Sequence, residues 1–127
     1  MEHSAIEREI SEQAKEWVDE YGEDFLVELI GYFLEDAAAR VTRLCQAAAA
    51  GDAGTLMLEA HTLKSSSASL GAQGLSTIAT RLEDIGRDGD LTALADNLEQ
   101  FEQQFAVVKA SLEELRSAPG KFISQER

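Results

Sequence analysis

One short segment of the sequence holds residue types that can carry phosphoryl chemistry. In this segment a histidine, His61, is followed three positions later by a lysine, Lys64. An imidazole ring is largely uncharged near neutral pH, because its ordinary pKa is about 6.5, so a ring nitrogen can attack phosphorus. An ammonium group one helical turn away can neutralise phosphate oxygens while phosphorus moves between donor and acceptor. We therefore expect His61 to be a candidate phosphoacceptor and Lys64 to support the transfer.

Helical periodicity predicts that His61 faces solvent. The apolar and small residues of the segment recur at steps of three and four and form one inward stripe: Leu56, Ala60, Leu63, Ser67 and Leu70. At about 100° per residue, His61 points about 140° away from the middle of that stripe. Met57, Ser65 and Ala68 lie on the same outer side, within two turns of the ring. Because residues 65 and 68 are small, a partner surface could approach closely, and we expect Met57 and Ala68 to contribute to docking.

The elements that position this segment are all predicted to be helices. Alanine, leucine and glutamate favour helix, and the single proline, Pro119, falls after the last apolar pattern. Apolar periodicity predicts helices over residues 4–20, 24–50, 53–70, 73–85 and 91–116. Gly22, Gly71 and Gly86 are expected to end the helices that precede them. The expected fold class is all-α, an antiparallel up-down four-helix bundle with an additional N-terminal helix.

The same pattern predicts the organisation of the chain. Residues 1–23 form the N-terminal helix and its turn, residues 24–116 form the bundle, and residues 117–127 form a flexible tail. The last helix carries leucine, phenylalanine and valine alternately three and four residues apart from Leu91 to Leu115, which is typical of a seam packed inside a bundle. An intramolecular core accounts for that seam, so we expect a monomer.

Charge and hydropathy exclude several classes of function. The 127 residues carry 24 acidic and 11 basic side chains, a formal net charge of −13. Such a surface repels nucleic-acid backbones and anionic lipid. No apolar run reaches the roughly 18 to 20 residues of a membrane span, and the N-terminus lacks the features of a signal peptide. We expect a cytoplasmic domain that contacts neither nucleic acid nor membrane.

The longer pattern around His61 resembles the histidine-containing phosphotransfer (HPt) domain family of two-component phosphorelays. Ala60-His61-Thr62-Leu63-Lys64 is followed by a serine run and Leu70-Gly71-Ala72, in the family's order. Leu82-Glu83-Asp84-Ile85-Gly86 is similar to the end of the family's next helix, and Phe33-Leu34-Glu35-Asp36 also matches. The resemblance covers about residues 24–116. A histidine and a lysine three apart form a weak motif alone, but this longer order is specific.

The resemblance implies roles and partners. His61 would receive the phosphoryl group from an aspartate of a receiver domain and pass it to another receiver, with Lys64 assisting electrostatically. Glu83 falls where many relatives have glutamine or another polar residue, so it would orient the ring, although a solvated helix residue explains it equally well. Partners would be response-regulator receiver domains and a hybrid sensor histidine kinase. This chain would bind no cofactor, and Mg²⁺ would be held by the receiver.

One position departs from the family pattern. The glycine that follows the lysine in the family is Ser65 in this sequence. A hydroxymethyl group one turn from His61 would hydrogen-bond the ring or the phosphate, or narrow the approach of a partner. This affects the expected tightness of docking and rate of transfer, and leaves the acceptor unchanged.

Three other functions are alternatives to phosphotransfer. A di-metal carboxylate bundle needs a Glu-x-x-His pair on each of two helices, but Leu58 stands where the glutamate would be and we assign no role to the other histidine, His3. An autonomous kinase needs a phosphate-binding loop, which is lacking. The remaining alternative is a helical adaptor that binds receiver or kinase domains without carrying phosphate.

Overall fold

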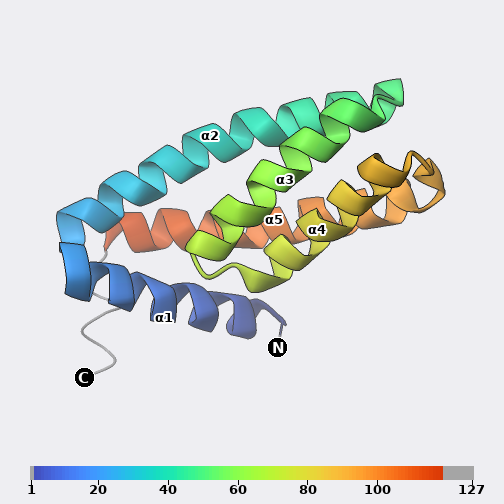
Figure 1. Ribbon diagram of the computed structural model, residues 1–127. Coiled ribbons are helices and arrows are strands. Elements are labelled where there is room, and N and C mark those ends of the chain that lie inside the picture. The colour runs from blue at the N-terminus through green and yellow to red at the C-terminus, as the bar shows by residue number, and fades with distance from the viewer. Residues whose placement is uncertain (1, 119–127) are drawn as a thin grey trace.

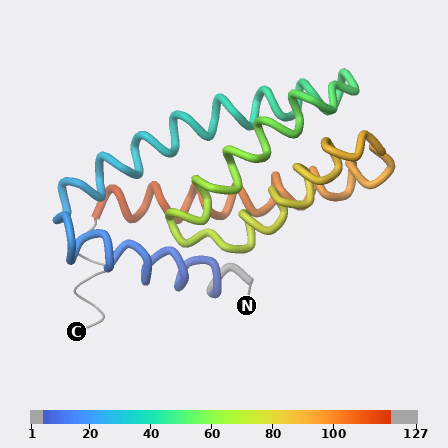
Figure 2. The backbone as a smooth tube through the Cα atoms, in the orientation of Figure 1, coloured from blue at the N-terminus to red at the C-terminus, as the bar shows by residue number. Residues whose placement is uncertain are grey.

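The computed structural model describes residues 2–118, with side chains from Ala5 onward, and this part of the chain contains helices and no strand (Figure 1). The helices, in chain order, are α1 (Glu2–Tyr21), α2 (Glu23–Ala50), α3 (Ala53–Ser69), α4 (Gln73–Asp88), the 3₁₀ turn η1 (Leu91–Ala93) and α5 (Leu94–Ser117). Short turns join them, so each helix runs back along the one before it (Figure 2). The predicted all-α bundle with an extra N-terminal helix is confirmed.

Helix α1 packs into the same core as the bundle. Its inward residues Ile6, Ile10 and Ala14 are buried together with the apolar faces of the other helices. The helix lies beside α5 and the turn between α3 and α4 (Figure 1). At its C-terminal end the Trp17 Nε1–H donates to the carbonyl oxygen of Ser69 at 3.0 Å. The N-terminal helix therefore holds the end of the histidine-bearing helix in place.

The turn between α3 and α4 depends on one glycine. Gly71 has a φ of 82°, in the left-handed region that glycine adopts without steric cost. A Cβ atom at this position would lie 2.6 Å from the carbonyl oxygen of Glu9 on α1. Glycine is thus needed at this turn for two reasons: its positive φ and its close contact with the backbone of α1.

The predicted end of the fourth helix at Gly86 is wrong. Helix α4 continues to Asp88, and Gly89, with a φ of 77°, occupies the left-handed capping position. Gly86 is buried inside the helix, where an added Cβ would lie 2.8 Å from both the Ala53 carbonyl oxygen and the Met57 amide nitrogen. This glycine does not end a helix; it lets α4 approach the backbone of α3.

The start of the last helix also differs from the prediction. Residues 91–93 form the 3₁₀ turn η1, capped by Asp90, whose Oδ1 accepts the Thr92 amide hydrogen at 3.1 Å. The α-helix begins at Leu94, and its seam is buried at Leu94, Phe101, Val108, Leu112 and Leu115. Helix α5 ends at Ser117, and residues 119–127 of the predicted tail lie outside the described residues. No helix in the described part of the chain combines the length and hydropathy needed to cross a membrane.

Candidate functional site

His61 is presented to solvent from the middle of α3. Asp52 caps the N-terminus of the helix. Its Oδ1 accepts the Thr55 amide hydrogen at 3.1 Å, so this amide of the first turn has a hydrogen-bond partner. All members of the predicted inward stripe are buried: Leu56, Ala60, Leu63, Ser67 and Leu70. The His61 side chain lies off that stripe and is 59% exposed. The ring is therefore accessible to another protein while its helix is fixed by the core.

A buried carboxylate from α4 holds the inner edge of the ring. The Glu83 side chain is only 5% exposed, and its Oε2 lies 2.8 Å from His61 Nδ1. Its other oxygen, Oε1, accepts a hydrogen bond from Lys64 Nζ at 2.8 Å. The structure thus brings His61, Lys64 and Glu83 together and excludes the interpretation of Glu83 as a solvated helix residue.

A fourth residue, Arg87, completes this network and was not among the predicted site residues. Its Nη2 donates to Glu83 Oε2 at 2.9 Å, the same oxygen that contacts the ring. Its Nη1 donates to Asp84 Oδ1 at 2.9 Å. The signal was present in the sequence, because residues four apart on a helix lie on one face and Arg87 follows Glu83 by four.

The electrostatics of the network fix which ring nitrogen faces Glu83 with a hydrogen. The pKa of Glu83 is lowered to about 2, mainly by the hydrogen bond from Lys64 and further by the one to His61, against the opposing effect of burial. Glu83 is therefore ionised at neutral pH and can only accept hydrogen bonds. A ring nitrogen held 2.8 Å from this anion must carry the hydrogen, so Nδ1 is the donor. In a neutral ring with this tautomer Nε2 keeps its lone pair, and the side chains of residues 5–118 provide no hydrogen bond to it.

Two further contacts set the distance between α3 and α4. The Ser76 hydroxyl, buried on α4, donates to the Lys64 carbonyl oxygen at 2.9 Å. Toward the other end of α4, Gly86 allows the close approach to Ala53 and Met57 described above. Glu83 lies between these two contacts along α4. Its reach to the ring is therefore determined by packing on both sides.

The other predicted residues border the ring without bonding to it. Ser65 is exposed on the next turn of α3, and the described residues provide no hydrogen bond to its hydroxyl; its carbonyl accepts from the Ser69 hydroxyl at 3.1 Å. Met57 and Ala68 are half-buried, Met57 because Gly86 of α4 packs against it. The surface of α3 on either side of His61 therefore carries small or half-buried side chains and is only partly apolar.

A second ion-pair cluster lies on the α2 side of α3. The Glu59 side chain, 13% exposed, accepts from Arg40 Nη1 at 3.1 Å and from Arg43 Nε at 2.9 Å. Arg40 Nε also pairs with Asp36 at 2.8 Å. These two arginines therefore join α2 to α3 through Glu59.

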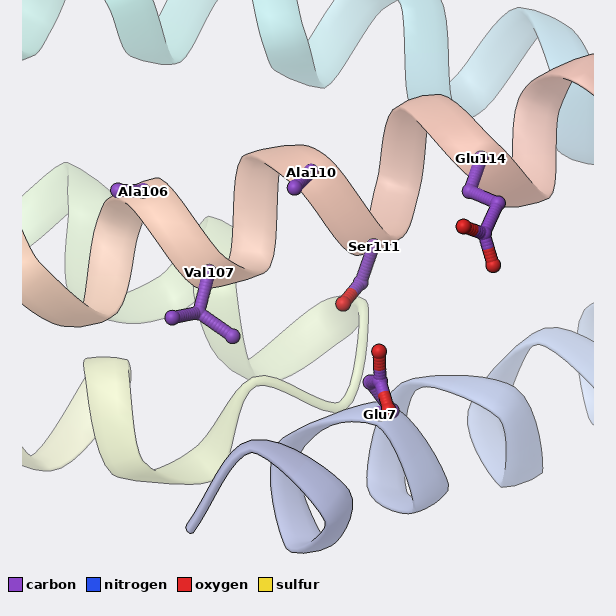
Figure 3. Close-up of a pocket in the computed structure, with 6 residues that line it drawn as sticks. All are labelled: Glu7, Ala106, Val107, Ala110, Ser111 and Glu114. Atoms are coloured by element: carbon purple, nitrogen blue, oxygen red, sulfur yellow. The ribbon is translucent and has the colours of Figure 1, made fainter.

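Two other features of the surface do not involve this site. A pocket between α1 and α5 is lined by side chains from both helices (Figure 3): Glu7, Ala106, Val107, Ala110, Ser111 and Glu114. None of them is a predicted site residue. Among residues 5–118, whose side chains the structure describes, no three histidine, cysteine or acidic side chains gather closely enough to hold a metal ion.

An exposed imidazole backed by a buried carboxylate and accompanied by a lysine, on a four-helix bundle, defines a histidine phosphotransfer module. The comparisons with known proteins agree. A family profile described as the Hpt domain matches residues 28–118. The structure is similar to the crystal structure of histidine-containing phosphotransfer protein B (HptB) from Pseudomonas aeruginosa PAO1, with a TM-score of 0.76 and 32% sequence identity over 82% of this chain and 90% of that chain.

The chain belongs to the Hpt domain family, and its function is histidine phosphotransfer in a phosphorelay. The family implies phosphorelay partners such as receiver domains and kinases. A comparison with curated protein sequences gives no match.

The lowered pKa of Glu83 predicts a specific acid dependence of stability. Because the pKa of about 2 lies below the ordinary value, the ionised carboxylate stabilises the fold above about pH 4.5, and this contribution is lost as pH falls toward 2. Replacing Glu83 by glutamine should lower the free energy of unfolding at pH 7 by about 1 to 2 kcal/mol, less than the full shift implies because Lys64 and Arg87 keep access to water. Urea unfolding at a series of pH values measures this.

The difference between wild type and the Glu83→Gln variant should be constant above about pH 5 and shrink below pH 4.5. Glu99→Gln, on an exposed position of α5, is the matched control and should change the stability little at any pH. A Glu83→Gln difference that stays constant down to the lowest pH at which both proteins fold would contradict the prediction.

Proposed function

We propose that His61 is the residue that carries the phosphoryl group, and that Nε2 is the atom phosphorylated. The observation that supports this most is the contact between Nδ1 and the buried, ionised Glu83, on a ring that is otherwise open to solvent. It leaves Nε2 as the nitrogen with a free lone pair pointing away from the anion. In the described part of the chain, His61 is the histidine with these surroundings.

The proposed step conserves the hydrogen on Nδ1. The Nε2 lone pair attacks the phosphorus of an acyl phosphate on a receiver aspartate, and the bond between phosphorus and the aspartate oxygen breaks as the N–P bond forms. The electron pair stays on the leaving carboxylate, and the ring gains a positive charge that faces Glu83. Discharge to a second receiver reverses these changes. We propose that the divalent cation used in transfer, Mg²⁺, is held by the receiver and that this chain binds none.

Lys64 is proposed to stabilise the charge on the transferring phosphoryl group. Its Nζ is held by Glu83 Oε1 at 2.8 Å, and its side chain is 33% exposed, so it can turn toward phosphate oxygens when they arrive. Replacing Lys64 by glutamine should slow phosphotransfer by about tenfold to a hundredfold, because one preorganised positive charge is lost. Rapid-quench transfer assays with labelled receiver measure the rate, and Lys109→Gln on an exposed position of α5 is the control. An unchanged rate in the Lys64 variant would remove it from the site.

The surface around His61 is proposed to dock receiver domains, with Met57, Ser65 and Ala68 beside the ring. A hybrid sensor histidine kinase is the proposed source of phosphate, and this chain is proposed to have no kinase activity of its own. We also propose that it works in the cytoplasm as a monomer. Sedimentation equilibrium checks the last point, with a single species near 13.8 kDa expected.

The test of the proposed function is transfer from a panel of labelled, phosphorylated receiver domains to the folded protein in the presence of Mg²⁺. We expect label that is stable in alkali and lost in acid, mapped by mass spectrometry to His61. The alternative, an adaptor that binds receiver or kinase domains without carrying phosphate, predicts complex formation with no labelled histidine. Absence of transfer from every receiver would favour that alternative.

A further inference from the structure

We infer that Glu83 also controls how readily phosphorylated His61 gives up its phosphoryl group, by keeping the ring protonated at Nδ1 after phosphorylation. The inference rests on the proposed role of His61 as the acceptor. Its geometric basis is the 2.8 Å contact between Nδ1 and Oε2 of a carboxylate that is only 5% exposed. Once Nε2 is bonded to phosphorus, the ring is cationic unless the Nδ1 hydrogen leaves. A buried anion against Nδ1 opposes that departure.

Ring protonation decides the leaving group when the phosphoryl group moves on. From the protonated ring, the N–P bond breaks with both electrons remaining on Nε2, and a neutral imidazole with its hydrogen on Nδ1 is released. The phosphoryl group goes to a receiver carboxylate or to water. From the deprotonated ring the same cleavage releases an imidazolate anion, a much stronger base and so a poorer leaving group. Glu83 thus keeps the stored group transferable and, for the same reason, shortens its lifetime in water.

Arg87 acts in the opposite direction through the same oxygen atom. Its Nη2 donates to Glu83 Oε2 at 2.9 Å, beside the 2.8 Å contact of that oxygen with His61 Nδ1. An oxygen that already accepts from a guanidinium attracts the ring hydrogen less strongly. Removing the charge of Glu83 and removing the charge of Arg87 should therefore change the protonation of the ring in opposite senses.

The other charged groups around the ring are already paired. Lys64 of α3 donates a hydrogen bond to Glu83 Oε1, and Asp84 of α4 accepts one from Arg87 Nη1. On the α2 side of α3 the charged groups pair with one another: Asp36, Arg40, Arg43 and Glu59. None of these forms a hydrogen bond or an ion pair with Nδ1 in the described residues. Glu83 is the anion through which the surroundings act on the ring.

The experiment follows the loss of phosphohistidine as a function of pH. The full chain, Glu83→Gln and Arg87→Gln are phosphorylated with phosphoramidate, the donor is removed, and the decay is followed by phosphorus NMR from pH 6 to 9. Ring nitrogen NMR reports the hydrogen on Nδ1 directly. Glutamine at position 83 keeps an oxygen acceptor for Nδ1–H, so it removes the charge and preserves the orientation.

For the wild type we expect a decay rate that changes little between pH 6 and 8. In Glu83→Gln the rate should fall as pH rises and be about tenfold slower at pH 8, as loss of a hydrogen bond to a charged group implies. In Arg87→Gln the pH range over which the decay rate stays nearly constant should extend to higher pH than in the wild type. Circular dichroism checks that each variant is folded, and Arg87, being 54% exposed, provides a variant that should fold in any case.

The outcomes separate this inference from the proposed function. Failure of the wild type to form phosphohistidine at position 61 would overturn the proposed function. Phosphohistidine in all three proteins with one common pH profile would overturn the inference alone. A change in the same sense in both variants would mean that the network only supports the local structure, and would also overturn the inference.

Discussion

Replacing His61 by glutamine should abolish phosphotransfer to this protein and leave its fold intact. Loss of the nucleophile should lower the rate by at least about a thousandfold, to the background of the assay. The side chain is 59% exposed and outside the core, and glutamine keeps an N–H donor that can face Glu83, so the free energy of unfolding should change by less than about 1 kcal/mol. Transfer from labelled receiver and urea unfolding measure the two effects.

Two controls make the His61→Gln result specific. His3→Gln removes the other histidine of the chain and should transfer at the wild-type rate. Binding of an unphosphorylated receiver, measured by calorimetry, should persist in His61→Gln, because the docking surface is unchanged. Residual acid-labile label in His61→Gln would show that another residue carries phosphate.

Replacing Gly86 by alanine should destabilise the protein, although alanine normally stabilises a helix relative to glycine by about 1 kcal/mol. The new Cβ would lie 2.8 Å from backbone atoms of Ala53 and Met57, which cannot turn away as a side chain could. Helix α4 would have to move from α3, at a cost of about 1 to 3 kcal/mol. Because Glu83 is one turn earlier on α4, its contact with His61 should lengthen, and phosphotransfer should slow as well.

Gly31→Ala is the matched control for this substitution. Gly31 lies in the interior of α2, and an added Cβ there would meet its nearest neighbour, Arg116 Nη1, at 3.7 Å, an ordinary contact. This variant should be as stable as the wild type or more stable, by up to about 1 kcal/mol. Thermal and urea unfolding of both variants measure the difference. Equal stability of Gly86→Ala and Gly31→Ala would contradict the prediction, because it would mean that α3 and α4 move apart without loss of stability.

The helices and the exposed position of His61 could be predicted from the sequence because both depend on local periodicity. Every inward residue predicted on α3 is buried, and the ring projects away from them. The end of α4 could not be predicted in the same way. Glycine is equally consistent with a helix end and with a close helix contact, and only the partner backbone decides between them.

The network around the ring was predictable only in part. The place of Glu83 in the family pattern suggested a contact with the ring. The burial of the Glu83 side chain, however, depends on the distance between α4 and α3. That distance is set by Ser76 and Gly86, whose partners, Lys64 and Met57, lie 12 and 29 positions earlier in the chain. Contacts between helices at such separations leave no periodic signal in either helix.

The packing of α1 separates two boundaries that are easily taken as one. The family profile begins at residue 28, already inside α2. The hydrophobic core begins earlier, at Ile6, and the backbone of Glu9 lies against Gly71 beside the end of the histidine-bearing helix α3. The stretch that the family profile matches is thus shorter than the stretch whose side chains pack into one core. We therefore expect the folding unit of this protein to include α1, which lies before the residues that the family profile matches.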